Sequence, residues 1–295
     1  MFVGKLKHAA VSLFRILCSE IVHSELVLRD VHNMSLHCNE RGVSDEKLID
    51  EPLIVSLTTF GSRIMDAYLV IESIMQQTVK PNRIILWLDE NEFDDSKLPS
   101  LLKRLCLRGL EIRYCANIRS YKKIIPTLKL APEATIVTID DDVIYPQDFL
   151  EKLVCAYRND KKCVYFYRGR YIAKRKKGLA PYRSWKMVNT AEKRMDVLPT
   201  GIGGVLYPQG CFADGVLDEK TFMDLCPKAD DVWLRVMTIL KGYPCCLIEY
   251  PGRFRYSFVN IDRNQSLALS NKNLYSGDND LQLKKVFSFF KLAID

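Results

Sequence analysis

The stretch that decides the fold is Ala134-Thr135-Ile136-Val137-Thr138-Ile139, which is followed at once by Asp140-Asp141-Asp142. Its first six residues are apolar or β-branched, which is typical of a buried strand. Three carboxylates are therefore expected together at the end of one strand. Carboxylate oxygens attract Mg²⁺ and Mn²⁺, and Mg²⁺ is commonly held by one or two carboxylates plus substrate phosphates. A metal site for a phosphate-bearing substrate is one interpretation, and a plain acidic turn is the other.

Strand-like stretches alternate with helical patterns around this segment. Strands are expected at residues 53–59, 83–88 and 110–114, and helices over 63–77, 98–107 and 120–130. This alternation predicts βαβ units and a parallel sheet that is covered by helices on both faces. Ligands bind at the carboxyl ends of the strands in such sheets. Three of the predicted strands end in side chains suited to a nucleotide, at Thr58-Thr59, at Asp89 and at the Asp140 triplet.

A second acidic pair, Asp230-Asp231, opens a predicted helix that runs to about Leu240. Asp230 has the character of an N-cap, so one interpretation is that both acids only cap the helix and meet its dipole. The other is that one of them is the base of a metal-assisted reaction. Residues 199–208, upstream of this pair, are rich in glycine, which allows backbone to approach a ligand but is equally typical of a plain turn.

Basic residues gather between 168 and 177, after a strand-like stretch at 164–167. A solvated loop is the plain interpretation of this basic patch. The alternatives are a contact with an anionic acceptor or lipid phosphate, and a contact with nucleic acid. The basic residues are Arg168, Arg170, Lys174, Arg175, Lys176 and Lys177.

The composition narrows the classes of chemistry. The chain has 295 residues, of which 48% are hydrophobic, so it can bury the core of one large domain or two small ones. Its ten cysteines form no Cys-x-x-Cys pair, which argues against zinc and fits a reduced, cytoplasmic compartment. All four histidines precede residue 38, so carboxylates are expected to do the acid–base work. The net charge of +7 favours anionic partners.

The N-terminus has apolar residues at helical spacing from Phe2 to Ile21, with Lys5, Lys7 and Arg15 on other faces. Such an amphipathic helix either lies on an anionic membrane or docks on the core of its own protein. No segment reaches the ~20 apolar residues of a membrane span. We expect an N-terminal helix and extension over 1–50, a main domain over 51–258, and a C-terminal tail and helix over 259–295. The expected location is cytoplasmic, with peripheral contact at the inner face of the membrane.

Several motifs, taken in order over residues 52–250, resemble a GT-A-fold glycosyltransferase, most of all the bacterial enzymes that build surface polysaccharides. The Asp140 triplet matches the DXD motif of that family, and the pair Asp230-Asp231 resembles its late acidic motif. The resemblance implies an α/β, Rossmann-like fold with a mixed, mostly parallel central sheet and helices on both faces. The other matching stretches are Ile54–Thr59, Ile84–Asp89, Ser120–Pro126, Gly203-Gly204 and Ala229–Trp233.

The resemblance also implies roles for individual residues. The implied activity is transfer of a sugar, with inversion, from a nucleotide-diphosphate donor to a glycan or lipid-linked glycan, with Mn²⁺ or Mg²⁺ and without nucleic acid as a partner. Asp231 or Asp230 is the expected base, Asp142 and Asp140 are the expected metal ligands, and Gly203, Gly204 and Trp233 are expected to contact the acceptor. Expected donor contacts are Ser56, Thr58, Arg63, Asp89, Lys122, Lys123, Asp140 and Asp141. Some family members add a C-terminal histidine ligand, which is absent here; Asp262, Asp278, Asp280, or water with the diphosphate, are the candidates to replace it.

Two other classes of function remain as alternatives. A nucleotidyltransferase is expected to carry a glycine-rich phosphate loop after its first strand, whereas residues 57–63 contain only Gly61. A non-catalytic nucleic-acid-binding protein would use the basic patch at 168–177. Against that class, 36 acidic residues nearly balance 43 basic ones, and no nucleic-acid-binding motif is present.

Overall fold

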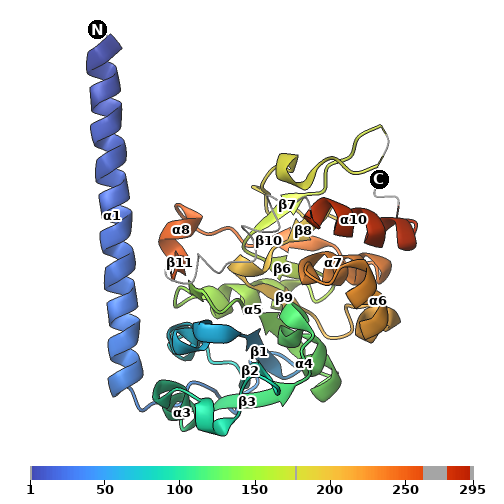
Figure 1. Cartoon of the computed structure of the whole chain (residues 1–295), viewed down its shortest axis with the longest axis horizontal. Helices are drawn as coiled ribbons and strands as arrows, with labels where there is room; N and C mark the ends of the chain where they lie inside the picture. Colours follow the sequence, from blue (N-terminus) through green and yellow to red (C-terminus); the bar gives the residue numbers. More distant parts are fainter. Residues whose placement is uncertain (1, 177, 262–277, 293–295) are drawn as a thin grey trace.

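The centre of the molecule is a seven-stranded sheet (Figure 1). The computed structural model describes residues 2–176, 178–261 and 278–292, and side chains from Cys18 onward. The strands of this sheet are β1 (Leu53–Thr58), β2 (Arg83–Asp89), β3 (Leu110–Cys115), β4 (Thr135–Thr138), β6 (Val164–Phe166), β9 (Val205–Tyr207) and β10 (Cys245–Leu247). Their order is β10-β6-β9-β4-β1-β2-β3, with β9 antiparallel to both neighbours and all other pairs parallel. The expected mixed, mostly parallel sheet is confirmed.

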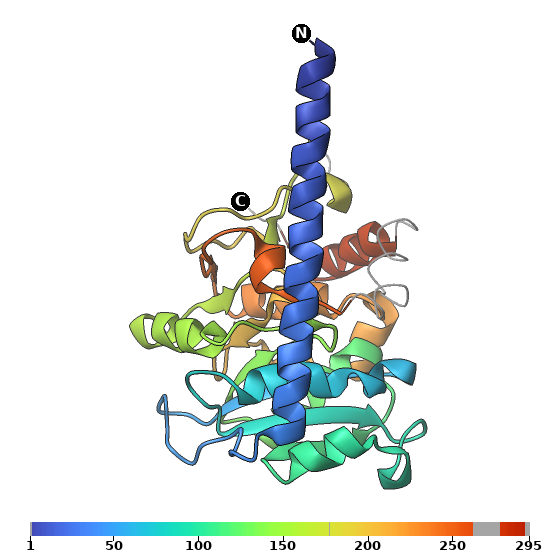
Figure 2. The same ribbon diagram turned by 90° about the vertical axis from the view of Figure 1, so that its left-hand side faces the viewer.

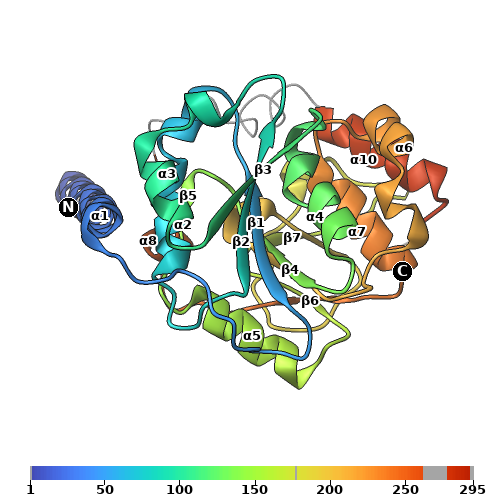
Figure 3. The same cartoon turned by 90° about the horizontal axis from the view of Figure 1, so that it is seen from below.

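Helices cover both faces of the sheet, as expected. Figure 3 shows α2 and α3 on one side of the strands and α4 and α7 on the other. The α-helices are α1 (Phe2–His37), α2 (Ala67–Met75), α3 (Ser100–Cys106), α4 (Ile125–Leu130), α5 (Phe149–Asn159), α6 (Glu219–Leu225), α7 (Asp230–Leu240), α8 (Phe254–Ser257) and α10 (Asp278–Phe289). Short 3₁₀ helices are η1 (Gly61–Met65), η2 (Asp95–Lys97), η3 (Arg119–Lys123), η4 (Tyr182–Ser184), η5 (Gly201–Gly203) and η6 (Asp214–Leu217).

Strand β1 is apolar almost throughout because both of its faces are buried. Leu53, Val55 and Leu57 belong to the core that includes α2, whereas Ile54 packs on the opposite face with Ile136. All four side chains are fully buried. A strand buried on both faces reads as a continuous apolar run instead of an alternating one.

The antiparallel strand β9 brings two distant segments together. In the ladder Val205, its first residue, pairs with Thr138, the last residue of β4. Since β9 runs against β4, the chain that enters β9 lies at the same edge of the sheet as the Asp140 triplet that leaves β4. Two small sheets complete this edge. One pairs β7 (Gly169–Tyr171) with β8 (Val197–Pro199), and the other pairs β5 (Val143–Ile144) with β11 (Val259–Asn260).

Two predicted helices are each divided in the structure. The one expected over 120–130 changes from η3 to α4 at Ile124, because Pro126 lies in the first turn of α4 and has no N–H to continue a helix from η3. The one expected over 63–77 changes from η1 to α2 at Asp66.

Helix α1 extends to His37, well beyond the expected amphipathic segment. Its C-terminal part is held by tertiary contacts: Val31 is buried, His32 Nδ1 lies 2.8 Å from Tyr68 Oη, and Arg104 Nε donates to the Ser35 carbonyl. These contacts stabilise the helix beyond about residue 24, where its sequence is polar and weakly periodic. The N-terminal part of α1 projects past the rest of the molecule (Figures 1 and 2). Among the described residues, no helix combines the length and apolar character needed to cross a bilayer.

The C-terminal helix α10 packs on the face of the sheet that α7 covers. Leu283, Val286 and Phe287 are buried in the same core cluster as Trp233 of α7. This helix begins at Asp278, earlier than the segment from Lys284 that the sequence suggested.

Candidate active site

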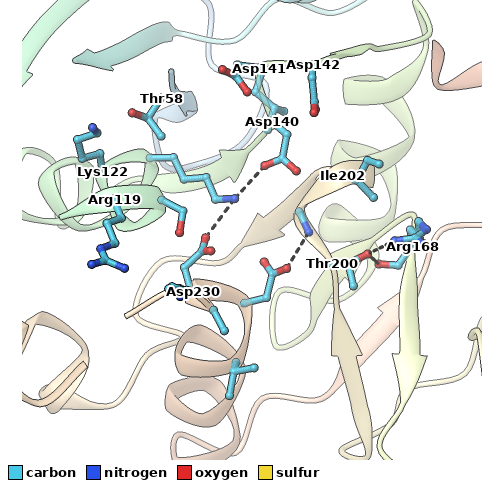
Figure 4. A pocket seen from close by; sticks show the side chains of 18 of the residues that line it. Thr58, Arg119, Lys122, Asp140, Asp141, Asp142, Arg168, Thr200, Ile202 and Asp230 are labelled. Carbon is cyan, nitrogen blue, oxygen red and sulfur yellow. Dashed lines mark hydrogen bonds and ion pairs between the residues drawn. The ribbon is translucent and has the colours of Figure 1, made fainter. Parts of the chain in front are cut away.

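A cavity of about 820 Å³ opens at the carboxyl ends of β1 and β4 (Figure 4). Most of its polar lining is charged, and it comes from segments far apart in the sequence. The charged residues are Arg63, Glu92, Arg119, Lys122, Lys123, Asp140, Asp141, Asp142, Arg168, Arg170, Lys228, Asp230, Asp231 and Arg255. The fold thus gathers both acidic motifs in one cavity, with the triplet after the carboxyl end of β4 and the pair at the start of α7.

Arg63 joins two carboxylates of the triplet. Its Nη2 lies 2.7 Å from Asp141 Oδ1 and 2.6 Å from Asp142 Oδ2. Thr59 Oγ1 donates to the other oxygen of Asp141 at 2.5 Å. Burial raises the pKa of Asp141 to about 7 despite the guanidinium beside it. Arg63, expected to contact the donor, therefore lines the cavity with its charge already paired.

Lys123 joins the two acidic motifs across the cavity. Its Nζ lies 2.9 Å from Asp140 Oδ1 and 3.1 Å from Asp230 Oδ2, and Figure 4 draws both ion pairs. The side chain is only 7% exposed. Burial opposes its positive charge, but Asp140, Asp230 and Asp231 outweigh burial and hold the pKa of Lys123 well above its ordinary value.

Asp231 lies in the first turn of α7, next to the backbone of Gly201. Its Oδ2 accepts a hydrogen bond from the Gly201 N–H at 3.2 Å. A Cβ on Gly201 would meet Asp140 Oδ1 and Lys123 Nζ, both at 2.9 Å, so a larger residue there would displace the ends of these two side chains. Burial, followed by the charge of Asp230, raises the pKa of Asp231 to about 7.

The expectation that Asp230 caps α7 is wrong. The N-cap residue is Ala229, no side chain caps the helix, and Asp230 is already its first residue. Its carboxylate contacts Lys123 instead of an α7 backbone N–H. Asp230 and Asp231 therefore line the cavity instead of capping α7. They interact with the start of the helix only through its dipole, which favours negative charge there.

The carboxylate oxygens of the Asp140 triplet are suited to a divalent cation that binds few protein ligands. Asp140 and Asp142 each keep one carboxylate oxygen outside every hydrogen bond and ion pair of the described residues. No group of three or more His, Cys, Asp or Glu side chains in the described part of the chain is arranged to hold a metal. Two carboxylates fit Mg²⁺ or Mn²⁺ where a diphosphate and water complete the coordination.

Five residues expected at the site do not line the cavity. Ser56 is fully buried and shares a hydrogen bond with Thr127, Asp89 accepts from the Asn91 N–H, and Trp233 donates to the Val216 carbonyl. Gly203 and Gly204 approach the Arg168 backbone and the Phe149 ring, and Gly201 and Ile202 line the cavity in their place. We assign these five residues no ligand. Thr58, Lys122, Lys123, Asp140, Asp141 and Asp142 do line it, together with Asp230 and Asp231.

Several cavity residues were not expected from the sequence. Arg119 lines the cavity and has a φ of 57°, a left-handed conformation that is uncommon for residues other than glycine. No pattern in the sequence indicates this conformation. Arg168 and Arg170 belong to the basic patch, for which an anionic ligand was one alternative, and Thr200 belongs to the glycine-rich stretch 199–208. No pattern in the sequence indicated Arg255.

The other basic residues of the patch lie outside the cavity, and the described acids considered as replacements for a histidine metal ligand have other partners. Lys174, Arg175 and Lys176 are exposed outside the cavity lining. Asp278 pairs with Lys228 at 3.0 Å, and Asp280 accepts from the Tyr182 N–H. Lys177 and Asp262 lie outside the described residues.

Comparisons with known proteins give similarity of structure only. No protein-family model matches the chain, and no curated protein matches its sequence. A mannosyltransferase from Pyrobaculum calidifontis, solved with GDP-Man and Mn²⁺, is 12% identical with a TM-score of 0.42, over 79% of this chain and 64% of its own. A 2-C-methyl-D-erythritol 4-phosphate cytidylyltransferase from Thermus thermophilus is 10% identical with a TM-score of 0.42, over 74% and 97%.

A third similar structure is CMP:2-keto-3-deoxy-manno-octonic acid synthetase complexed with CTP. It is 10% identical with a TM-score of 0.39, over 68% of this chain and 89% of its own. Likeness at this level does not assign an activity to the chain.

Replacing Lys123 by methionine is expected to lower the free energy of unfolding by about 3 kcal/mol at pH 8, because it leaves buried carboxylates without a cation. The loss is expected to be smaller at pH 5, where Asp231, with its pKa of about 7, holds a proton. Urea denaturation at the two pH values measures both. Lys129→Met, at an exposed lysine of α4, is the control and is expected to change stability by less than about 0.5 kcal/mol. Equal stability of Lys123→Met and the wild type would contradict the assigned role.

Proposed function

We propose that this protein is a metal-dependent glycosyltransferase, which moves a sugar from a nucleotide-diphosphate donor to a hydroxyl group of a glycan acceptor. The observation that carries the proposal is the pairing of Lys123 with both Asp140 and Asp230, which brings two distant acidic motifs to opposite sides of one cavity. The sequence resemblance to enzymes of bacterial surface polysaccharide synthesis supports a glycan, free or lipid-linked, as the acceptor.

The donor would lie over β1 and β4, where cations and carboxylates meet. Asp140 and Asp142 would hold Mg²⁺ or Mn²⁺, which when bound supplies positive charge at the diphosphate. Lys122 and Arg119 line the same end of the cavity, and neither pairs with a carboxylate in the described part of the chain. Negative charge grows on the leaving diphosphate as the sugar bond breaks, so these cations stabilise the transition state more than the bound donor.

Asp231 is the proposed base. An attacking hydroxyl must lose a proton, and a positioned carboxylate that accepts it contributes typically 10²–10⁴-fold to the rate. The pKa of about 7 makes Asp231 a stronger base than an ordinary aspartate. Its hydrogen bond from Gly201 holds the carboxylate in place at the cavity wall, across from Asp140. Attack from the side opposite the diphosphate corresponds to inversion.

The other two classes fit the site less well. Nucleic-acid binding through the basic patch would need its cations together on one outer surface. Arg168 and Arg170 line the cavity instead, and Lys174, Arg175 and Lys176 are the described cations of the patch that lie outside it. A nucleotidyltransferase remains the nearest alternative chemically, since it too uses metal-binding carboxylates; it differs in taking a nucleoside triphosphate and releasing pyrophosphate.

The projecting part of α1 is proposed to contact a membrane surface. Lys5, Lys7 and Arg15 lie in it, and the first acidic residue of the chain is Glu20. A cationic amphipathic helix binds anionic headgroups, and this placement would bring the enzyme to lipid-linked acceptors at the inner face of the membrane.

A nucleoside diphosphate with Mn²⁺ is expected to raise the melting temperature, because it binds only the folded chain. At 100 times its Kd the rise is on the order of 5 °C. GDP, UDP, CDP and dTDP are each tested by thermal shift with Mn²⁺ and with EDTA. Asp142→Ala is expected to remove the part of the shift that Mn²⁺ supplies, and Asp224→Ala, at an exposed aspartate of α6, is expected to keep it. Shifts independent of both Mn²⁺ and Asp142 would count against the metal site, and pyrophosphate release from CTP and a sugar would indicate a nucleotidyltransferase.

Asp231→Asn is expected to lower kcat/KM by about 10²–10⁴-fold once a donor and acceptor are known. In the wild type kcat/KM should rise with pH to a plateau above about 7, because the base acts only after it loses its proton. The asparagine variant should lack this rise. Asp224→Asn controls for loss of a carboxylate elsewhere. The assignment fails if Asp231→Asn turns over at the wild-type rate with both substrates saturating.

Deletion of residues 2–17 is expected to abolish sedimentation with phosphatidylserine vesicles while leaving the melting temperature unchanged, because the docked part of α1 remains. The triple variant K5Q/K7Q/R15Q, which keeps the helix, should weaken vesicle binding about 100-fold, at about 1 kcal/mol per charge. Neutral phosphatidylcholine vesicles are the control. Unchanged binding by the truncated chain would refute the contact.

A further inference from the structure

The cavity has cationic side chains at two separate ends. In Figure 4, Arg119 and Lys122 lie at one end and Arg168 at the other, with Asp140 and Asp230 between them. A donor diphosphate accounts for the first group in the proposed function. The second group lies beyond the acidic residues, and the donor diphosphate does not account for it.

This second group is an arginine cluster of Arg168, Arg170 and Arg255, all of which line the cavity. They come from the turn before β7, from β7 itself and from α8. Arg168 Nη1 donates to Thr200 Oγ1 at 3.2 Å, and Arg170 Nη1 donates to the Trp185 carbonyl at 2.7 Å. Both partners are neutral. The Nε of Arg170 is buried and has no hydrogen-bond partner in the described structure.

The cluster differs from Arg63 and Lys123, the two cations that hold the acidic residues of the cavity. Arg63 and Lys123 each pair with two carboxylates, whereas no carboxylate of the described residues lies within ion-pair distance of Arg168, Arg170 or Arg255. Burial, together with the charges of Arg170 and Arg255, lowers the pKa of Arg168. A half-buried cation beside two others is costly until an anion joins it.

The arginine cluster is adjacent to the proposed base. Arg168 binds the side chain of Thr200, and the next residue, Gly201, donates its N–H to Asp231. The guanidinium of Arg170 lies 5.2 Å from the ring centroid of Tyr182, which lines the same wall. A ligand held by the cluster would therefore lie on the acceptor side of the cavity.

We infer that Arg168, Arg170 and Arg255 form a second anion subsite, which binds an oxyanion carried by the acceptor. The inference rests on the proposed function, since that function divides the cavity into donor and acceptor sides. Guanidinium groups bind phosphate and carboxylate with paired, charge-assisted hydrogen bonds. The oxyanion is either a phosphate of a lipid carrier or the carboxylate of an acidic sugar, and two probes separate these sources.

The test is isothermal titration on the full chain, with the donor side saturated by the nucleoside diphosphate and Mn²⁺ that bind best. The probes are farnesyl diphosphate, for a lipid-borne phosphate, and methyl glucuronide, for an acidic sugar. At least one is expected to bind, and Arg168→Gln and Arg255→Gln are each expected to weaken it about tenfold without changing the nucleotide Kd. Arg255 is exposed, so its substitution spares the fold. Arg183→Gln, at an exposed arginine outside the cavity lining, is the matched control.

The possible results separate the two proposals. Binding of either probe that depends on Arg168 and Arg255 supports the subsite and identifies the source of its oxyanion. If nucleotide binds but both probes bind more weakly than about 1 mM, or equally well to the arginine variants, the subsite is refuted while the proposed function stands. If no nucleotide binds, the proposed function fails; arginine-dependent probe binding to the free protein would then still support an anion site.

Discussion

The arrangement of the site depends on one buried cation. Asp140, Asp230 and Asp231 converge at one cavity, where three unneutralised carboxylates would repel one another. Lys123 resolves this conflict by lying between Asp140 and Asp230. It thereby ties the end of β4 to the first turn of α7, which belong to different parts of the chain. Arg63 does the same for Asp141 and Asp142, so two internal cations hold the acidic side chains in position.

Charge is distributed unevenly across the cavity as a result. On the β1 and β4 side the cations that hold the carboxylates are paired, and Lys122 and Arg119 remain for a ligand. On the β7 side the arginines have only neutral partners. The half-buried acid Asp231 lies between these regions. Such a cavity is suited to a reaction that joins two anionic molecules, because each would meet its own cations and the proposed base Asp231 would lie between them.

The sequence predicted the parallel half of the fold because buried strands need apolar runs, as in β1 and β4, and because acids that follow such strands meet at one edge. It did not predict the antiparallel direction of β9, a three-residue strand too short to show a pattern. Nor does sequence fix where a side chain points near a strand end, so Ser56 faces Thr127 and Asp89 turns back to its own loop. Arg119 begins η3 and Arg255 lies in α8, and both of these helices are too short to show a periodic pattern in the sequence.

The wall formed by Thr200–Gly204 is held at both ends, since β8 ends at Pro199 and β9 begins at Val205. An added methyl group at Gly201 would lie 2.9 Å from Asp140 Oδ1 and Lys123 Nζ, so the ends of both side chains would have to shift. With few residues between two strands, this wall is expected to tolerate exchanged side chains better than inserted residues. The connection between β7 and β8 brings Tyr182 to the same cavity, and its exposed stretch 174–176 can absorb added length. Among relatives of this fold, variation in length should accordingly fall in the connection between β7 and β8 instead of in the Thr200–Gly204 wall.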